Sequence, residues 1–335
     1  MLKFNVEEFL ENGRKTYDLR GKIESVSDML SKDGYENIIL TGVGGTTAEL
    51  ASVEVIIKHY SDVPVYLLNA AEALLQKNKN ITKNSLVITG SKSGDTKETV
   101  AICKYAKNLG SEVIVFTGSE NSPLAKSSTQ MIKSQIGGMD NAYLRFYLFA
   151  LRLLYNRGDF PMYEKFADQM ANLHANLARL KEEYDPVAAE IAKKYWEEPY
   201  QIWVGSGVLY GELYMFTMCI LEEMQWMRTK LVSSAEFFHG TLELVEKDVL
   251  VFLVKGEDEL RPLDERAERF LKKTTDKLVV IDTKDFKLEG IDDEFRYILS
   301  PILFNNATRG RLCEHYEANS GHDLEYRRYY RQFEY

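Results

Sequence analysis

The chain repeats one pattern of strand, glycine-rich turn and long helix, and this repetition limits the fold more than any other feature. In the first copy, the apolar run 38–41 is followed by a glycine turn and the helical stretch 48–59. In the second copy, the apolar run 202–204 is followed by a glycine turn and the helical stretch 208–227. Further apolar runs follow at 65–68, 86–89 and 113–116, and again at 231–232, 249–254 and 278–281. Strands that alternate with helices predict parallel sheets flanked by helices.

A length of 335 residues suits two domains of about 150 residues each. We therefore expect an α/β protein with two doubly wound, flavodoxin-like domains. The stretch between the two copies is mostly compatible with helix, and the pair Asp185-Pro186 is expected to break it. The expected organisation is an N-terminal helical segment 1–36, a first domain 37–160, a helical connector 161–197, a second domain 198–318 and a C-terminal tail 319–335.

The bulk properties exclude several classes of protein. The net charge of −9 disfavours a nucleic-acid partner, because such proteins usually present a basic face. The chain contains no apolar run near the roughly 20 residues that cross a bilayer, so we expect no membrane partner. Residues 1–8 have neither the basic start nor the apolar core of a signal peptide, which predicts a cytoplasmic protein.

The segment 91–96, Ser-Lys-Ser-Gly-Asp-Thr, lies between the apolar run 86–89 and the amphipathic stretch 97–106. A strand, a hydroxyl-rich turn and a helix N-terminus in this order form an anion site that suits a phosphate monoester, and the Lys92 ammonium adds to it. The same residue types also serve as ordinary helix caps. The spacing differs from the Walker phosphate loop, so a nucleoside triphosphatase is not expected. The matching segment of the second copy, 255–258, is acidic and lacks hydroxyls, so only the first copy should hold phosphate.

The glycine turn of the first copy, 42–47, matches a dinucleotide-binding fingerprint only in part. That fingerprint needs glycine at the place of Thr47 and an acidic residue after the second strand, where this chain has Asn69. Nicotinamide binding is therefore not expected. Glycine allows the backbone to approach a ligand closely. We expect such an approach to the phosphorylated ligand at Gly44, Gly45 and Thr46.

Three motifs together resemble the sugar isomerase (SIS) domain family. They are the Ser-x-Ser-Gly-x-Thr segment at Ser91, the Gly-Ser-Gly turn at Gly205 with Tyr210 after it, and Glu-x-x-His-Gly at Glu236. Double-domain members of this family include the isomerase half of glucosamine-6-phosphate synthase and the fructosamine 6-phosphate deglycases. The resemblance implies two SIS domains. It places the phosphate of a sugar at Ser91, Lys92, Ser93 and Thr96, with Gly44, Gly45 and Thr46 nearby.

The resemblance also implies the catalytic groups. In the family, a carboxylate near the end of the second domain's first helix moves a proton between sugar carbons, and the histidine of Glu-x-x-His-Gly assists ring opening. Those positions here are Glu223 and His239, whose separation of sixteen residues matches the family. Glu222 would face about 100° away on a helix. Without the resemblance, both groups would be interpreted as a solvated carboxylate and a packing histidine. Glu236 either orients the histidine or caps the turn.

The C-terminal segment 322–335 looks like the tail of the fructoselysine 6-phosphate deglycases, and it suggests His322 and Arg328 as tail residues near the site. The synthase carries a lysine in its tail, and the matching place here is Arg331. Arginine stays protonated and does not readily form an imine, so the synthase reaction is disfavoured. Arg327 and Arg331 are expected to form surface ion pairs. One departure is Phe216, where many relatives carry a second glutamate.

The expected function is that of a fructosamine 6-phosphate deglycase. It would cleave fructoselysine 6-phosphate, or a related conjugate of an amino acid and a 6-phosphosugar, to glucose 6-phosphate and the free amino acid. General acid–base chemistry suffices, so no metal or organic cofactor is expected. The resemblance implies a homodimer or higher homo-oligomer in which the histidine reaches the neighbouring subunit's site. An aldose–ketose phosphosugar isomerase and a non-catalytic phosphosugar sensor remain alternatives, and the sequence leaves the amine and the type of sugar open.

Overall fold

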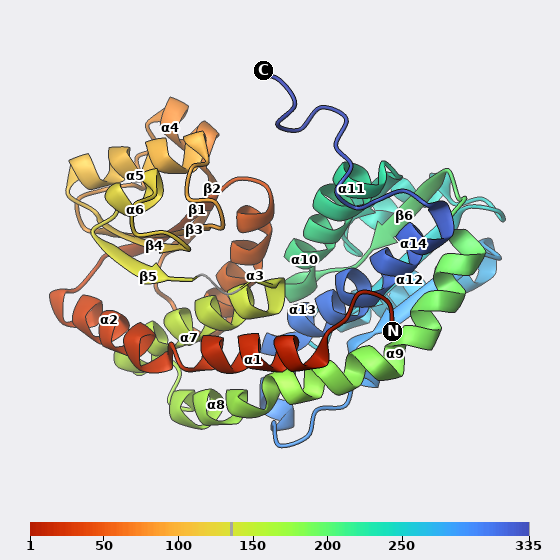
Figure 1. The fold of residues 1–335 in the computed structure, drawn as a ribbon, viewed down its shortest axis with the longest axis horizontal. Coiled ribbons are helices and arrows are strands. Elements are labelled where there is room, and N and C mark those ends of the chain that lie inside the picture. The colour runs from red at the N-terminus through yellow and green to blue at the C-terminus, as the bar shows by residue number, and fades with distance from the viewer. Residues whose placement is uncertain (135–136, 335) are drawn as a thin grey trace. The chain divides into compact units, whose positions relative to one another are not determined.

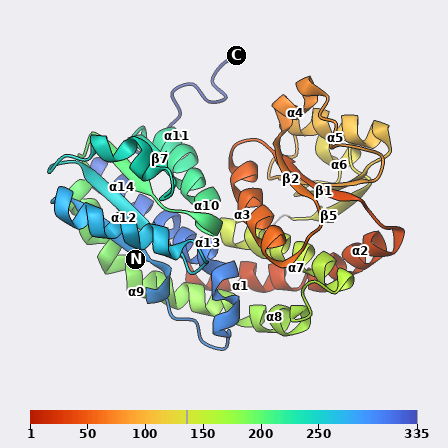
Figure 2. The same cartoon turned by 180° about the vertical axis from the view of Figure 1, so that it is seen from behind.

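The computed structural model describes residues 1–134 and 137–334, and Figures 1 and 2 show its fold from opposite sides. Residues 135, 136 and 335, which belong to the expected first domain and tail, lie outside the described residues. The chain divides into two compact units, Leu10–Ala171 and Met1–Phe9 with Asn172–Tyr335. This boundary falls inside the expected connector 161–197. Among the described residues, no helix combines the length and the apolar character that crossing a membrane requires.

The unit Leu10–Ala171 contains a five-stranded parallel sheet in the order β2-β1-β3-β4-β5. This order is that of the flavodoxin-like doubly wound fold, so the predicted fold class is confirmed. The edge strand β5 is short and only half apolar, and the sequence did not predict it. The strands are β1 (Asn37–Gly42), β2 (Val65–Asn69), β3 (Ser85–Ser91), β4 (Glu112–Thr117) and β5 (Gln130–Lys133).

Helices cover both faces of this sheet (Figures 1 and 2). One face carries α4 (Ala70–Gln76), α5 (Lys97–Leu109) and α6 (Pro123–Lys126). The remaining helices that begin in this unit are α2 (Arg20–Asp33), α3 (Gly45–Tyr60), α7 (Met139–Arg157) and α8 (Tyr163–Gln169). The helix α1 (Val6–Tyr17) and α2 make up most of the expected N-terminal segment.

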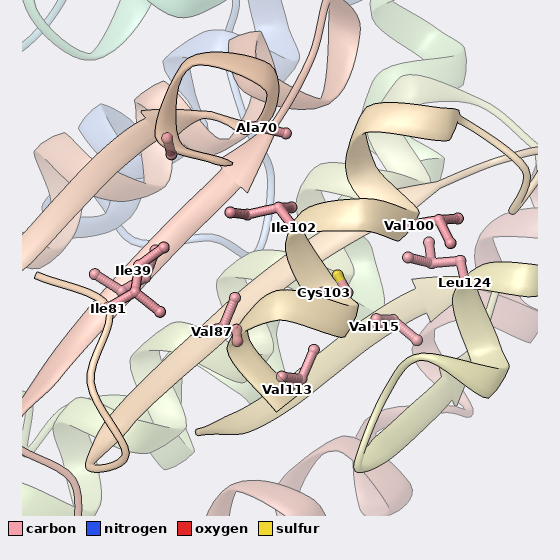
Figure 3. Close-up of a cluster of buried hydrophobic side chains, with 12 residues drawn as sticks. Ile39, Ala70, Ile81, Val87, Val100, Ile102, Cys103, Val113, Val115 and Leu124 are labelled. Atoms are coloured by element: carbon pink, nitrogen blue, oxygen red, sulfur yellow. The ribbon is translucent and has the colours of Figure 1, made fainter. Parts of the chain in front are cut away.

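Figure 3 shows the core between this sheet and α5. Val87 and Val115 of the central strands lie buried against Ile102 and Cys103 of α5. Cys103 is a free thiol, and its burial raises its pKa to about 12. Because this apolar layer fixes α5 on the strands, it also fixes the loop 91–96 that joins β3 to α5.

The second unit contains a four-stranded parallel sheet in the order β7-β6-β8-β9. This is the order of the first sheet without its last strand, so the repeated plan predicted from the sequence is confirmed. The strands are β6 (Tyr200–Val204), β7 (Arg228–Val232), β8 (Leu250–Lys255) and β9 (Leu278–Asp282). The helices of this unit include α9 (Leu173–Tyr195), α10 (Tyr210–Tyr214), α11 (Glu223–Gln225), α12 (Arg261–Thr274), α13 (Arg296–Ala307) and α14 (Cys313–Ser320).

An aromatic cluster explains why this chain has Phe216 where many relatives carry a glutamate. The rings of Trp203 and Phe252 stack with centroids 4.0 Å apart, and Phe216 packs edge-on against Trp203 at 5.2 Å. Phe304 of α13 closes the cluster against Phe216 at 6.0 Å. Phe216 is completely buried. A glutamate at this position would place a charge inside an apolar core, which is strongly unfavourable.

The expected break at Asp185-Pro186 is wrong, because α9 continues through both residues. Pro186 is exposed, so water can bind the backbone carbonyl that loses its N–H partner. Leu180 and Ala188 are buried on either side of the proline and hold the helix in place. The Asp185 carboxylate accepts a hydrogen bond of 2.7 Å from Nε of Arg311. Tertiary packing therefore outweighs the local preference for a break.

Candidate functional site

The residues predicted to bind phosphate follow two neighbouring strands. Strand β1 ends at Gly42 and β3 ends at Ser91, and the two strands pair directly in the sheet. Helix α3 begins at Gly45 and α5 at Lys97, immediately after these turns. In the order β2-β1-β3-β4, the connection after β1 leads to one side of the sheet and the connection after β3 leads to the other side. The place where the direction reverses is the topological switch point, and doubly wound folds bind their ligands there.

The hydroxyl groups of the loop 91–96 converge. The Oγ atom of Ser91 lies 3.2 Å from Oγ1 of Thr96 and 3.4 Å from Oγ of Ser93. It also accepts a hydrogen bond of 3.0 Å from the backbone N–H of Gly94. Lys92 is exposed. The structure thus brings three of the predicted phosphate ligands, Ser91, Ser93 and Thr96, into one small volume.

Two helix N-termini open toward this switch point without a side-chain cap. Thr96 at the start of α5 makes no side-chain hydrogen bond to the helix backbone, and Gly44 at the start of α3 has no side chain that could cap the helix. Helix N-termini that lack such a cap are typical anion-binding positions. Gly44 has a φ of +53°, which favours glycine. Thr46 donates its hydroxyl to the carbonyl of Gly90 at 3.1 Å, which ties α3 to the end of β3.

Gly94 is a structural requirement of the loop that the site prediction missed. It is buried and has a φ of +70°. A Cβ atom there would lie 2.6 Å from Oγ of Ser122 and 2.7 Å from Oγ1 of Thr117. The only signal in the sequence was a glycine among hydroxyl residues. Glycine is needed here because the loop backbone packs directly on the end of β4.

The matching switch point of the second sheet is filled by the protein itself. Asp258, which follows β8, accepts hydrogen bonds from the backbone N–H groups of Val208 at 2.8 Å and Leu260 at 3.0 Å. Glu257 pairs with the buried Arg296 at 2.9 Å. A side-chain carboxylate thus occupies the helix N-terminus that phosphate would need, so phosphate binding in the first copy alone stays a prediction with a structural basis.

Glu223 lies at the point where a π-helix gives way to an α-helix. The helical stretch predicted from 208 to 227 is continuous but composite: after α10 the residues Met215–Glu222 form a π-helix, and α11 begins at Glu223. π-Helical turns are rare and often occur at functional sites. The stretch ends at Trp226, whose φ of +57° is unusual for a residue other than glycine. This backbone strain lies three residues after the predicted base.

Glu223 opens onto a cavity of about 580 Å³. The C-terminal tail forms one wall and the turn from α11 to β7 forms another. The lining residues are Glu222, Glu223, Trp226, Met227, Arg228, Thr229, Arg327, Arg328, Tyr329 and Tyr330. Such a volume is typical of small-molecule sites. Glu222 accepts a hydrogen bond of 2.5 Å from the hydroxyl of Thr229, whereas Glu223 pairs with the tail.

Arg327 is the partner of Glu223. Its Nε donates to Oε1 of Glu223 at 3.0 Å, and its Nη1 donates to the carbonyls of Leu324 at 2.7 Å and Tyr326 at 2.9 Å. The Arg327 side chain is 17% exposed and that of Glu223 33% exposed. The sequence predicted an ion pair for Arg327, but not that the pair is half-buried or that its partner is the candidate base.

The predicted tail residues His322 and Arg328 both contact Trp226. The Cζ atom of Arg328 lies 4.2 Å from the centroid of the Trp226 ring. The ring of His322 packs edge-on against the same indole with centroids 4.4 Å apart. The His322 carbonyl accepts a hydrogen bond of 3.1 Å from Nε2 of Gln225. The tail is thereby fixed beside Glu223 at three positions, through Arg327, Arg328 and His322.

His239 lies apart from Glu223 in the chain as the structure describes it. It belongs to the short 3₁₀-helix Phe237–His239, its side chain is exposed, and it does not line the Glu223 cavity. Glu236 is exposed as well. No hydrogen bond within residues 1–134 and 137–334 joins the side chain of Glu236 to His239. The structure therefore does not bring the two predicted catalytic groups together within one chain.

A buried network holds the start of the loop that carries His239. The backbone N–H of Ser234 donates to Oγ of Ser206 at 2.9 Å, and the Ser234 hydroxyl donates to Asp264 at 2.5 Å. Burial raises the pKa of Asp264 to about 6, although the hydrogen bond from Ser234 opposes this rise. The sequence gave no motif for this network, because Asp264 lies on α12, far along the chain.

Comparison with known proteins gives the family. The SIS domain model matches residues 30–150. The chain is 30% identical to the fructosamine deglycase FrlB of Bacillus subtilis (strain 168) over 308 residues. These aligned residues cover 90% of this chain and 93% of that protein. The chain is 25% identical over 309 residues to the fructoselysine 6-phosphate deglycase of Escherichia coli (strain K12), with 91% and 88% covered.

Solved structures agree with this result. A Bacillus subtilis protein designated a phosphosugar isomerase superposes with a TM-score of 0.85 at 28% identity, covering 90% of this chain and 93% of that one. A Salmonella typhimurium LT2 protein with the same designation superposes with a TM-score of 0.82 at 25% identity, covering 98% and 99%. The chain belongs to the SIS domain family, in the double-domain group that includes the fructosamine and fructoselysine 6-phosphate deglycases.

Proposed function

We propose that this protein is a fructosamine 6-phosphate deglycase, which converts fructoselysine 6-phosphate or a related conjugate to glucose 6-phosphate and the free amino acid. The observation that carries the proposal is the Glu223 carboxylate, which opens onto a cavity walled by a deglycase-like tail. The similarity to fructosamine deglycase FrlB over nearly the whole chain supports it.

The first step is the binding of the phosphate group. The hydroxyls of Ser91, Ser93 and Thr96 would bind its oxygens together with the first N–H groups of α5. Lys92 would add a positive charge, and the turn at Gly44, Gly45 and Thr46 would supply the N–H groups of α3. Binding of this unreactive group fixes the position of the distant reacting carbons.

The reaction then needs one acid and one base. His239 protonates the ring oxygen, which opens the ring and frees the C2 ketone. Glu223 removes a proton from C1, which gives an enaminol, and a proton returned to C2 converts this to an imine at C1. Water adds to the imine and releases the amine, which leaves glucose 6-phosphate. Each proton removed is replaced, so the steps require only general acid–base transfer.

The position of His239 supports a site shared between subunits. Its imidazole is exposed and lies outside the Glu223 cavity of its own chain. In a homodimer or larger homo-oligomer, the histidine of one chain would complete the site of another. Symmetric assemblies repeat such a contact in both directions, so each subunit would give and receive one histidine.

An aldose–ketose phosphosugar isomerase remains the second candidate, since two solved relatives are designated phosphosugar isomerases. It would use the same phosphate loop and the same base, but without an amine on the sugar. A non-catalytic phosphosugar sensor is the third candidate. It would bind the sugar phosphate and leave it unchanged.

The test is release of glucose 6-phosphate from fructoselysine 6-phosphate, measured with a coupled dehydrogenase beside Glu223→Gln. A deglycase releases glucose 6-phosphate, and the variant loses this activity while it still binds glucose 6-phosphate in calorimetry. Interconversion of glucose and fructose 6-phosphates without deglycation would identify an isomerase. Binding of glucose 6-phosphate with neither reaction would identify a sensor.

A further inference from the structure

The charges in the Glu223 cavity are not balanced. Each carboxylate has a hydrogen-bonding partner, since Glu223 pairs with Arg327 and Glu222 accepts from Thr229. Two further guanidinium groups, those of Arg228 and Arg328, line the same cavity. Within residues 1–134 and 137–334, no carboxylate pairs with either of them. The cavity therefore presents uncompensated positive charge beside the proposed base.

Arg328 differs from Arg228 because the protein holds it in place. Its guanidinium lies over the Trp226 ring, 4.2 Å from the ring centroid. Trp226 is itself held by the edge-on contact with His322 and by the end of the composite helix. A guanidinium stacked on an aromatic ring keeps the N–H groups at its edge available for hydrogen bonding. This arrangement suits a planar, bidentate anion such as a carboxylate.

The proposed substrate carries two kinds of anionic group. Its phosphate has a separate proposed site in the loop 91–96, which supplies three hydroxyls and a helix N-terminus. The remaining anion of an amino-acid conjugate is the carboxylate on its amine half. The proton that Glu223 removes in the proposed mechanism comes from C1, the carbon that bears the amine. The amine half must therefore lie close to Glu223.

We propose that Arg328, stacked on Trp226, binds the carboxylate on the amine half of the substrate and so selects amino-acid conjugates over conjugates of uncharged amines. This inference rests on the proposed deglycase function. It assigns the amine-side subsite to the tail and to the turn after α11. It also gives the strained backbone of Trp226 a role, since this residue both ends the helix and carries the stacked guanidinium.

The experiment compares substrates that differ only in this charge. The 6-phosphofructosyl conjugates of lysine and lysinamide form one pair, and those of glycine and glycinamide form another. The wild-type protein should show a kcat/KM ratio of about 10- to 100-fold in favour of the carboxylate in at least one pair, as expected for a charge-assisted bidentate contact. In Arg328→Gln the ratio should fall toward one. Arg328→Lys should give an intermediate ratio, because it keeps the charge but loses the planar fork.

Arg266→Gln is the matched control. Arg266 also stacks on an aromatic ring, with its Cζ 4.0 Å from the centroid of Phe238, but it does not line the cavity. Its removal should leave the ratio unchanged. The affinity of Arg328→Gln for glucose 6-phosphate, measured by calorimetry, should equal that of the wild type.

Two results would overturn the inference. Equal use of the carboxylate and amide members of both pairs by the wild type would show that no carboxylate is recognised. A loss of glucose 6-phosphate affinity in Arg328→Gln, with the substrate ratio retained, would assign the arginine to the sugar phosphate. Failure to cleave any of the four conjugates is a separate outcome, because it would reject the deglycase function on which the inference rests.

Discussion

Nε of Arg327 lies 3.0 Å from Oε1 of Glu223, and the same guanidinium binds two backbone carbonyls of the tail. The two hydrogen bonds to the carbonyls of Leu324 and Tyr326 fix the guanidinium against the backbone of its own segment. Arg327 thereby holds the Glu223 carboxylate through Oε1, while Oε2 makes no hydrogen bond to this arginine. The orientation of the proposed base therefore depends on a segment more than a hundred residues later in the chain.

Removal of Arg327 should impair the proposed reaction without abolishing ligand binding. In Arg327→Gln, we expect kcat to fall about tenfold to a hundredfold, because a misplaced reacting group carries a penalty of this size. KM and the affinity for glucose 6-phosphate should change little, since the phosphate is bound elsewhere. Arg327→Lys should recover part of the loss. Steady-state kinetics and calorimetry measure both effects.

The control for this variant is Lys3→Gln. Lys3 forms an ion pair of 2.6 Å with Glu317 of α14 in the same unit, but its side chain is 60% exposed. Exposed pairs contribute little, so its loss should leave kcat unchanged. An Arg327→Gln protein with wild-type kcat would contradict the orienting role of Arg327.

Substitution of Gly94 should disable the phosphate loop. The added Cβ of Gly94→Ala would meet Ser122 and Thr117 at 2.6 to 2.7 Å, and the φ of +70° is unfavourable for alanine. The loop must move, so we expect the affinity for glucose 6-phosphate to fall at least about tenfold, as for a displaced charge-assisted contact. Calorimetry measures this loss.

Gly21→Ala is the matched control in the same unit, because a Cβ there meets no atom within 4 Å. Its position in the first turn of α2 predicts a small gain in stability, below the roughly 0.5–1 kcal/mol of a site in the middle of a helix. Phosphosugar affinity should stay at the wild-type value. Unchanged affinity in Gly94→Ala would mean that the loop 91–96 does not bind the phosphate.

Asp264 should make the stability of the protein depend on pH. Burial raises its pKa from an ordinary value of 3.8 to about 6, and the neighbouring Asp258 adds to this rise while Arg261 opposes it. Between these values the folded state binds more protons than the unfolded state, so the free energy of unfolding falls as pH increases. The full difference corresponds to roughly 3 kcal/mol.

Urea unfolding of the wild type and Asp264→Asn tests this dependence from about pH 4, near the ordinary pKa, to about pH 7, one unit above the raised pKa. The variant cannot titrate at this position, so its stability should fall less with increasing pH. Parallel curves for the two proteins would show that Asp264 does not titrate in this range. The comparison uses the difference in slope, because the amide also changes the hydrogen bond to Gly256.

Mixing of two inactive variants should restore activity if the site is shared. Glu223→Gln keeps His239, and His239→Asn keeps Glu223. In a mixed dimer, one of the two sites would then contain both intact groups. Random mixing should restore about one quarter of the wild-type activity, since half of the dimers are mixed and each has one intact site. No recovery, with subunit exchange verified by sedimentation or mass spectrometry, would contradict a shared site.

Much of the architecture could be predicted from local patterns. Apolar runs of strand length, each followed by a glycine or hydroxyl turn and a helix, determine a parallel sheet because such strands must be buried on both faces. The loop 91–96 was predicted for the same reason, since its hydroxyls, glycine and following helix lie within one short segment. Its hydrogen bonds are local and involve Ser91, Ser93 and Thr96.

The failures have a common physical cause. The break expected at Pro186 did not occur, because buried neighbours on both sides hold α9 together. The role of Phe216 depends on Trp203 and Phe304, which lie far from it in sequence. In each case, packing between distant segments decided the outcome.

The amino-acid sequence by itself thus determined the repeated α/β plan and the hydroxyl-rich loop 91–96, because each depends on residues that are neighbours along the chain. The candidate base Glu223 came from the resemblance to the family. Only the tertiary structure decided which groups surround Glu223. The contacts from Arg327 to Glu223 and from Arg328 to Trp226 join the tail to the end of a helix about a hundred residues earlier. No local spacing encodes such a contact, since it forms only when the whole unit has folded and buried its core.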